Sequence, residues 1–222
     1  FAQPDAIHGV YLPCWTYDTR TTTYYTGQRG EYYYVTETYT DRDSQGRPVQ
    51  RTRQVRHTRW YDASGTVLGT FDDILIAATL SLPPNRLADL EPWDLDQLKP
   101  YNPAFLSGFK AQRYQVDLAD GFERAKEVML PVIQSDVRSD IGGDEQRINS
   151  LDTEYRETTF KHLLLPVYAG AYRFNGKLFQ IVVNGRTGEI QGDRPYSVWK
   201  IALLVVSVLL LVILIVILFG DR

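Results

Sequence analysis

Carboxylates near the middle of the chain are the first residues that could do chemistry. Four of them recur at close to helical spacing: Asp136, Asp140, Asp144 and Glu145. On a helix, side chains four residues apart share one side, where a hard divalent cation finds oxygen ligands. Gly142-Gly143 interrupts that spacing, and charged residues at a helix end are more often caps or a solvated surface. Metal-dependent activity through residues 136–145 is therefore an alternative prediction, not the main one.

A basic run over residues 47–59 is the second group, with five arginines, one histidine and no acidic residue. Because strand side chains alternate between two faces, four of these cations would share one face of a strand: Arg51, Arg53, His57 and Arg59. Such a face could contact an acidic partner protein, anionic lipid headgroups or nucleic acid. The structural alternative is cross-strand pairing with Glu31 and Glu37.

Several classes of enzyme and site have no residues to support them. Gly176-Lys177 follows an apolar run, but Ala171 and Leu178 stand where a P-loop needs glycine and serine or threonine. The G-x-G-x-x-G, G-x-S-x-G and H-E-x-x-H motifs are missing from the sequence. A single cysteine, Cys14, excludes an internal disulfide and a cysteine zinc site. We therefore predict no catalytic residues, no metal ligands and no cofactor.

The charge balance also bears on partners. The chain carries 24 Lys and Arg against 27 Asp and Glu, a net charge of −3, so no global basic field favours nucleic acid. Trp93 lies in an acidic, proline-rich stretch. We predict that Trp93 and the arginine face contact a protein partner or lipid, and a module that binds lipid headgroups or nucleic acid through residues 51–59 is an alternative prediction.

The elements that carry these residues are mostly strands. Tyrosine and threonine are frequent between residues 10 and 80, which is strand composition. Turn signals at 27–30, 41–48 and 62–65 divide this part into an antiparallel meander of four strands. The strands are expected near 10–25, 31–40, 50–61 and 66–80.

The second part of the chain follows a proline-rich connection over residues 83–110. After a short strand at 112–118, apolar residues recur at helical spacing up to Gly142-Gly143. Pro131 should kink this helix. A strand-like sequence pattern returns from about 153 to 191, with tight-turn dipeptides at Asn175-Gly176 and Asn184-Gly185.

The sequence of the C-terminal residues predicts a membrane anchor. Residues 201–219 contain one polar side chain, Ser207, and nineteen residues at about 1.5 Å each would cross a bilayer core of about 30 Å. Tyr196, Trp199 and Lys200 should lie at the membrane interface. The excess of basic residues before the span predicts a cytoplasmic position for the rest of the chain. We therefore expect a single-pass membrane protein.

Together these patterns predict an α+β fold, mainly antiparallel sheet with one longer kinked helix and a C-terminal transmembrane helix. The expected segments are a β meander at 1–82, a connection at 83–110, an α+β half at 111–198 and an anchor at 199–222. Similar strings in the two strand regions also fit two related halves.

Several strings resemble a family of bacterial zinc-ribbon membrane proteins, sometimes labelled primosomal or helicase-like. They are Gly9-Val-Tyr-Leu-Pro13, Tyr25-Thr-Gly-Gln-Arg-Gly30, Phe71-Asp-Asp73, Glu91-Pro-Trp-Asp-Leu95, Tyr114-Gln-Val-Asp-Leu118, Asp140-Ile-Gly-Gly-Asp-Glu-Gln-Arg147, Phe160-Lys-His162 and Val183-Asn-Gly-Arg-Thr-Gly-Glu189. The paired ribbon cysteines are missing from this sequence, so no zinc ligand carries over. Residues 172–190 also resemble the hairpin of PepSY-type modules. The resemblance implies a non-enzymatic, membrane-anchored adaptor or accessory subunit of a complex in a bacterial inner membrane, with at least one protein partner.

Overall fold

The computed structural model describes residues 3–4, 7–82, 84–174, 176–192 and 198–219. For residues 3–4, 84–85, 174, 198, 201 and 213–219 it describes the backbone alone. The chain forms two compact units. Unit 1 contains Phe1–Tyr11, Asn85–Ala111 and Leu165–Arg222, and unit 2 contains Leu12–Pro84 and Gln112–Leu164. Each unit is described below by itself.

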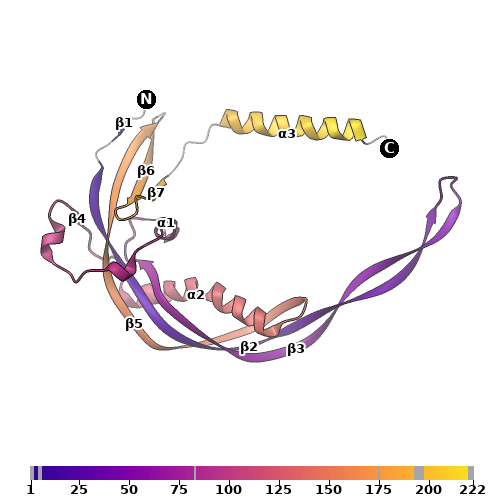
Figure 1. Ribbon diagram of the computed structural model, residues 1–222, viewed down its shortest axis with the longest axis horizontal. Coiled ribbons are helices and arrows are strands. Elements are labelled where there is room, and N and C mark those ends of the chain that lie inside the picture. Colours follow the sequence, from indigo (N-terminus) through magenta and orange to yellow (C-terminus); the bar gives the residue numbers. More distant parts are fainter. Residues whose placement is uncertain (1–2, 5–6, 83, 175, 193–197, 220–222) are drawn as a thin grey trace. The chain divides into compact units, whose positions relative to one another are not determined.

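Unit 2 is built on one very long hairpin. Strand β2, His8–Arg42, pairs antiparallel with β3, Pro48–Ala77. The register runs from Cys14 opposite Ala77 to Arg42 opposite Pro48, so a single twisted ribbon replaces the expected four-strand meander (Figure 1). Threonine and tyrosine are frequent in β2, and β3 adds valines and further threonines; β-branched and aromatic side chains favour this extended pairing.

Two of the expected turns lie inside these strands because their glycines serve close packing. Gly27 faces Ala63, and Gly65 faces Tyr25 in the paired register. A Cβ atom on Gly27 would lie 2.3 Å from the carbonyl oxygen of Arg147, and one on Gly65 would lie 2.7 Å from the Tyr25 hydroxyl. Glycine is therefore needed for the approach of neighbouring groups, and the strands continue through both positions.

Helix α2, Leu118–Ile141, covers one side of the hairpin in unit 2. The Asp117 side chain caps its first turn by accepting from the Asp120 N–H at 2.9 Å, and Gly142 ends it with a φ of 66°. Pro131 lies within the helix, as expected. The buried positions recur every four residues: Gly121, Ala125, Met129, Ile133, Val137 and Ile141. They pack against a strand layer that includes Trp15, Tyr17, Tyr25, Phe71 and Ile76.

The remaining strands complete a sheet in the order β3-β2-β5-β6-β7. Strand β5, Glu145–Phe174, pairs in unit 1 with β6, Lys177–Asn184, which pairs with β7, Ile190–Gly192. Two short strands also join: β1, Gln3–Pro4, beside β5, and β4, Lys110–Ala111, parallel to β2.

The proline-rich connection, which belongs to unit 1 from Asn85 onward, contains short helices. They are α1, Pro84–Asp89, and the 3-10 turns η1, Leu95–Gln97, and η2, Pro103–Leu106. The Asn184 amide group donates to the carbonyl oxygen of Leu90 at 2.9 Å, and Arg186 pairs with Asp94 at 2.7 Å. These bonds hold the connection against the end of β6.

Residues 201–219, expected to anchor the chain in a membrane, belong to helix α3, Val198–Phe219. In the part of the chain that the structure describes, no helix combines the length and the apolar character needed to cross a membrane. This finding contradicts the predicted transmembrane helix, and with it the fold class and the single-pass inner-membrane localisation that included it.

Candidate functional site: the β2–β3 arm and a carboxylate cluster

The distal part of the hairpin is a two-stranded arm, which we define as residues 32–58. Strand β5 begins next to Gly30 and Tyr32, where the Asp144 N–H donates to the Gly30 oxygen at 2.9 Å and the Tyr32 hydroxyl donates to Glu145 at 2.8 Å. Beyond this point β2 and β3 pair with each other, and Figure 1 shows them continuing past α2 and the start of β5. None of the residues described in the arm is buried.

One face of the arm, the odd face, carries the predicted cations. Odd-numbered side chains of β2 lie opposite odd-numbered side chains of β3, so the register places Arg51, Arg53 and His57 on one face, with Arg59 at its base. Acids lie on the other strand of the same face. Glu37 bonds Arg53 at 3.0 Å, and Asp41 bonds Arg51 at 3.3 Å.

Aromatic and aliphatic side chains separate these ion pairs on the odd face. The rings of Tyr33 and His57 stack with their centres 5.5 Å apart, and the Arg59 guanidinium lies 5.1 Å from the centre of the Tyr33 ring. Arg53 lies 5.6 Å from the Tyr39 ring. Cation–π contacts of this kind restrain long side chains. The predicted arginine face is therefore a ladder of tyrosines, valines and paired charges rather than a basic surface.

The even face of the arm has a different composition. Its β2 residues are Tyr32, Tyr34, three threonines and Arg42, and its β3 residues include Arg56. Arg56 lies 4.1 Å from the centre of the Tyr32 ring, whereas Tyr34 is 62% exposed. The even face thus offers an exposed tyrosine among hydroxyl groups.

Other predicted contact residues lie in unit 1. Trp93 is half-buried, and its ring N–H donates to the Leu87 carbonyl oxygen at 3.2 Å, so this side chain holds the connection together. Trp199 and Lys200 are exposed on α3. Tyr196 lies outside the described residues.

The carboxylates proposed as an alternative metal site have separate partners. The Tyr25 hydroxyl donates to Asp140 at 2.5 Å, and the Tyr32 N–H donates to Asp144 at 2.7 Å. Asp136 lies exposed on α2. Among the residues with described side chains, the groups close enough to share a metal ion do not include these four.

A different carboxylate cluster does form, at a β-bulge in unit 2. The register shifts between Tyr17 and Thr19, so that Asp18 of β2 faces both Asp72 and Asp73 of β3. Asp73 has a left-handed φ of 51°, a conformation that aspartate tolerates better than most residues. Oxygen atoms of the three carboxylates lie within 4.8 Å of one another.

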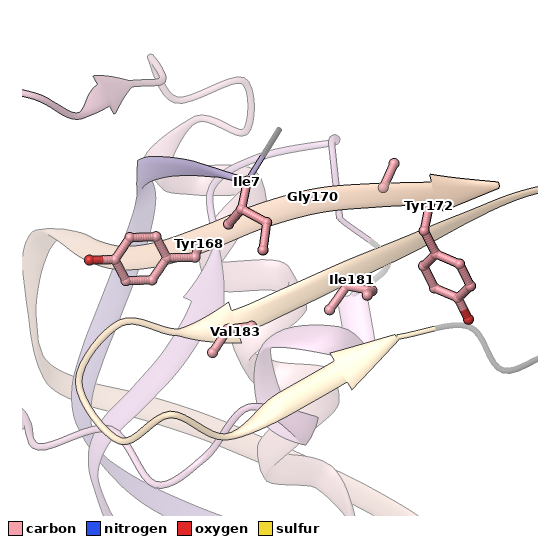
Figure 2. A pocket seen from close by; sticks show the side chains of 7 residues that line it. Ile7, Tyr168, Gly170, Tyr172, Ile181 and Val183 are labelled. Carbon is pink, nitrogen blue, oxygen red and sulfur yellow. The ribbon is translucent and has the colours of Figure 1, made fainter. Parts of the chain in front are cut away.

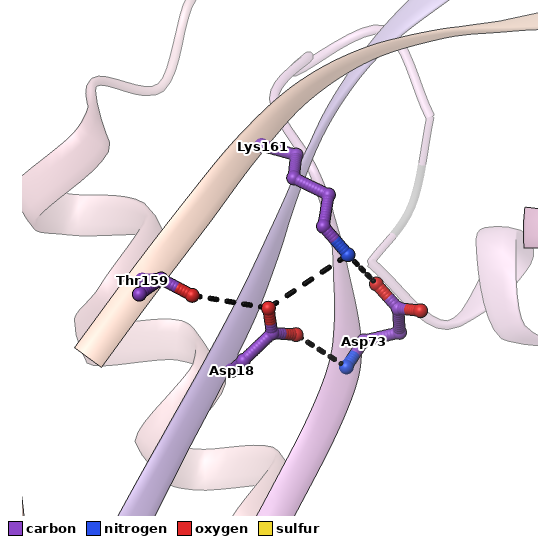
Figure 3. Close-up of polar contacts among 4 residues, drawn as sticks. All are labelled: Asp18, Asp73, Thr159 and Lys161. Carbon is purple, nitrogen blue, oxygen red and sulfur yellow. Dashed lines mark hydrogen bonds and ion pairs between the residues drawn. The ribbon is translucent and has the colours of Figure 1, made fainter. Parts of the chain in front are cut away.

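Hydrogen bonds tie this cluster to three strands, as Figure 3 shows. Asp18 accepts from the Asp73 N–H at 2.8 Å and from the Thr159 hydroxyl of β5 at 3.0 Å. The Lys161 ammonium group, also on β5, bonds Asp73 at 2.8 Å and lies 3.7 Å from Asp18. Lys161 therefore occupies the position next to the carboxylates that a cation would take.

Protonation also limits the charge of the cluster. Partial burial alone would raise the pKa of Asp18. The hydrogen bonds from Asp73, Thr159 and Asp72 and the positive charge of Lys161 together outweigh that effect, so the pKa of Asp18 is lowered. The hydrogen bond and the negative charge of Asp18 raise the pKa of Asp72. We call the three carboxylates together with Lys161 and Thr159 the carboxylate clamp, because their bonds hold the bulge in place. Sequence reasoning missed it because Asp18 and Asp72 are far apart until the strand register is known.

The remaining features offer less for chemistry. Burial raises the pKa of the Cys14 thiol to about 12, so this side chain is a poor nucleophile. A pocket beside Ile7 in unit 1 has a volume of about 50 Å³. Figure 2 shows its lining of aromatic and aliphatic side chains of β5 and β6, such as Tyr168 and Ile181. This volume is far below that of typical cofactor sites.

Comparison with known proteins adds one similarity. The chain is 29% identical over 114 residues to YdjG, an uncharacterized protein of Bacillus subtilis (strain 168). The match covers 51% of this chain and 33% of YdjG, so the chain spans about a third of that relative's length. No protein-family profile and no solved structure matches the chain. The resemblance to zinc-ribbon proteins therefore stays a prediction.

Proposed function

We propose that this chain is a non-enzymatic adaptor that binds a protein partner through its β2–β3 arm. The observation that carries this proposal is the exposure of tyrosine and arginine side chains on a two-stranded ribbon. Tyrosine and arginine are enriched among the residues that dominate protein interfaces. The arm exposes 41% of Tyr33 and 62% of Tyr34.

The arm also contributes little to the folded core. None of its residues belongs to the buried cluster beneath α2, and an isolated two-stranded hairpin is only marginally stable in water. Its ion pairs and cation–π contacts hold the long side chains in place. Side chains that are already ordered lose less entropy on binding, which favours a recognition role.

The charges of the arm favour a protein partner over lipid headgroups or nucleic acid. Arg51 and Arg53 are paired with Asp41 and Glu37, so these arginines carry little free charge for phosphates. The net charge of the chain, −3, acts in the same direction.

The test compares the full chain with a variant whose arm is shortened. Thr36 and Gln54 face each other in the register, so residues 37–53 can be replaced by an Asn-Gly turn that closes the hairpin. Both proteins are isolated under the same gentle conditions, and the co-purifying proteins are quantified by mass spectrometry. We expect a stoichiometric partner with the full chain and its loss with the shortened arm. Equal recovery from both proteins would overturn the proposal.

A further inference from the structure

We infer that the odd face of the arm binds the odd face of a second copy of this chain, with the two arms parallel. This inference rests on the proposed function and assigns one face of the same arm. The even face, with the exposed Tyr34, then stays free for a different partner, and the dimer presents it twice.

The odd face continues the side of the sheet that α2 covers. Odd-numbered side chains of β2 such as Thr21, Thr23 and Tyr25 are buried on that side. The helix ends at Ile141, whose Cδ1 atom lies 2.9 Å from a Cβ built on Gly27. Between Thr19 and Arg42 the register has no further shift, so the alternation is kept. Beyond Gly27 the same side of the ribbon therefore runs on into the arm without the helix.

The uncovered continuation carries apolar and aromatic side chains on both sides of its central Glu37–Arg53 ion pair. Tyr33, Val35, Tyr39 and Val49 are each about two-fifths exposed on this face. Exposed apolar rows on a sheet are associated with interfaces because their burial removes apolar surface from water.

Charge decides which occupant fits. On the odd face the β2 row is acidic, with Glu37 and Asp41, and the β3 row is basic, with Arg51 and Arg53. The same order holds at the base, where Glu31 lies opposite Arg59. A surface with one acidic edge and one basic edge is complementary to a copy of itself that is turned over.

Only one orientation brings opposite charges together. A two-fold axis along the arm places β2 of one copy over β3 of the other, so each acidic row meets a basic row. A two-fold axis across the arm would place acid over acid and arginine over arginine, which is repulsive. The complementary arrangement is isologous, as symmetric dimers require, and its two arms point in the same direction.

The size of the face predicts a weak dimer. Eleven residues per strand at about 3.3 Å each and two strands about 4.8 Å apart give a face of roughly 36 by 10 Å. Counted on both copies this is roughly 700 Å², below the low end of specific complexes at about 1,200 Å² in total. The dimer should therefore form in the micromolar range, and the exposed ion pairs should set its orientation more than its affinity.

Charge exchange tests the inference in the full chain. One variant carries Glu37→Arg and Asp41→Arg, and another carries Arg51→Glu and Arg53→Glu. Each makes both rows alike in charge. The quadruple variant with all four changes restores the intramolecular pairs with their signs reversed and serves as the matched control. Because α3 exposes large apolar side chains such as Leu203, all proteins are kept in a mild non-ionic detergent, and association is measured by sedimentation velocity.

We expect the natural chain and the quadruple variant to dimerise with similar dissociation constants. Each double variant alone should dimerise at least about tenfold more weakly, and an equimolar mixture of the two should recover dimers. A natural chain that remains monomeric at 100-fold above about 1 μM, or a mixture that recovers nothing, would overturn the inference. If the arm-dependent partner of the proposed function is still recovered in that case, the adaptor role stands and only the second copy is excluded.

Discussion

Cys14 is fully buried beside the strand pairing of unit 2, and desolvation raises the pKa of its thiol to about 12 from an ordinary value near 9. The unfolded chain releases this proton above about pH 9, whereas the folded chain keeps it. Its contribution to the free energy of unfolding is therefore complete below pH 9 and falls by about 1.4 kcal/mol per pH unit between 9 and 12.

The Cys14→Ala variant should lose less of its free energy of unfolding between pH 9 and 10 than the natural protein does. Burial also raises the pKa of Tyr17 and Tyr25 to about 12, but an unfolded tyrosine titrates near pH 10, so the two phenols contribute above that range in both proteins. Urea unfolding at pH 8, 9 and 10 measures the slope. An identical slope in the variant would contradict the assignment.

Lys161→Met tests the carboxylate clamp. Removing the ammonium group leaves Asp18, Asp72 and Asp73 facing one another, so we expect a loss of about 0.5–1 kcal/mol at pH 7, because these groups are partly exposed. The repelling carboxylates would have raised pKa values in the folded variant, so the loss should shrink as the pH falls below about 4. Thermal unfolding of the variant and of the exposed control Lys99→Met provides the comparison. A loss that is independent of pH would argue against the clamp.

The sequence predicts which face of a strand a side chain occupies, because side chains alternate along the strand. It does not predict which residue of another strand that side chain meets. Alternation within β3 put Arg51, Arg53 and His57 on one face, and the register agrees. The pairing of these arginines with Glu37 and Asp41 and the meeting of Asp18 with Asp72 depend on register. Register was not predictable here, because the expected turns that would have fixed it lie inside the strands.

At the scale of elements, α2 depends on a close approach to the sheet. A Cβ atom on Gly121 would lie 2.4 Å from the Tyr17 hydroxyl oxygen, which donates to the Leu118 carbonyl at 2.8 Å. Gly121→Ala should therefore destabilise the protein by about 1–2 kcal/mol, although alanine favours helix by nearly 1 kcal/mol. Ser135→Ala, at an exposed position of the same helix, is the control. Chemical denaturation measures both, and a stabilised Gly121 variant would show that the packing relaxes without cost.

The arm should be separable from the folded core. Its residues bury no apolar side chain against α2, so replacing residues 37–53 by an Asn-Gly turn should change the unfolding midpoint by less than about 3 °C. Differential scanning calorimetry of the full chain and the shortened variant makes the comparison. A large drop would mean that the arm stabilises the rest of unit 2, and losses of binding by the shortened variant would then need another explanation.

The elements themselves differ in how far the sequence predicts them. The periodicity before Gly142-Gly143 located the helix around Pro131, since a strong helical pattern with a glycine stop has few alternatives. The expected strand ends near glycines 27, 30 and 65 are wrong, because these glycines lie inside β2 and β3 and not in turns. A glycine required for close packing and a glycine required for a turn look alike until neighbouring strands are placed.

At the scale of the whole molecule, β2 and β5 each contribute residues to both compact units. The expected division at residue 83 treated the chain as consecutive halves, whereas each unit is assembled from separated segments. A proline-rich segment cannot reveal such an arrangement, because the arrangement depends on strand pairing between residues that are distant in the sequence. The apolar residues after 201 form helix α3, but the structure contradicts the span expected there.

The central claim is that the arm is the protein-contact element, and site-specific photocrosslinking in cells that produce the chain tests it most directly. A photoreactive phenylalanine analogue replaces Tyr34, on the even face of the arm, or Leu68, which is 78% exposed on β3 outside the arm. We predict discrete crosslinks to another protein from position 34 and only background from position 68. Equal or undetectable crosslinking at the two positions would contradict the account.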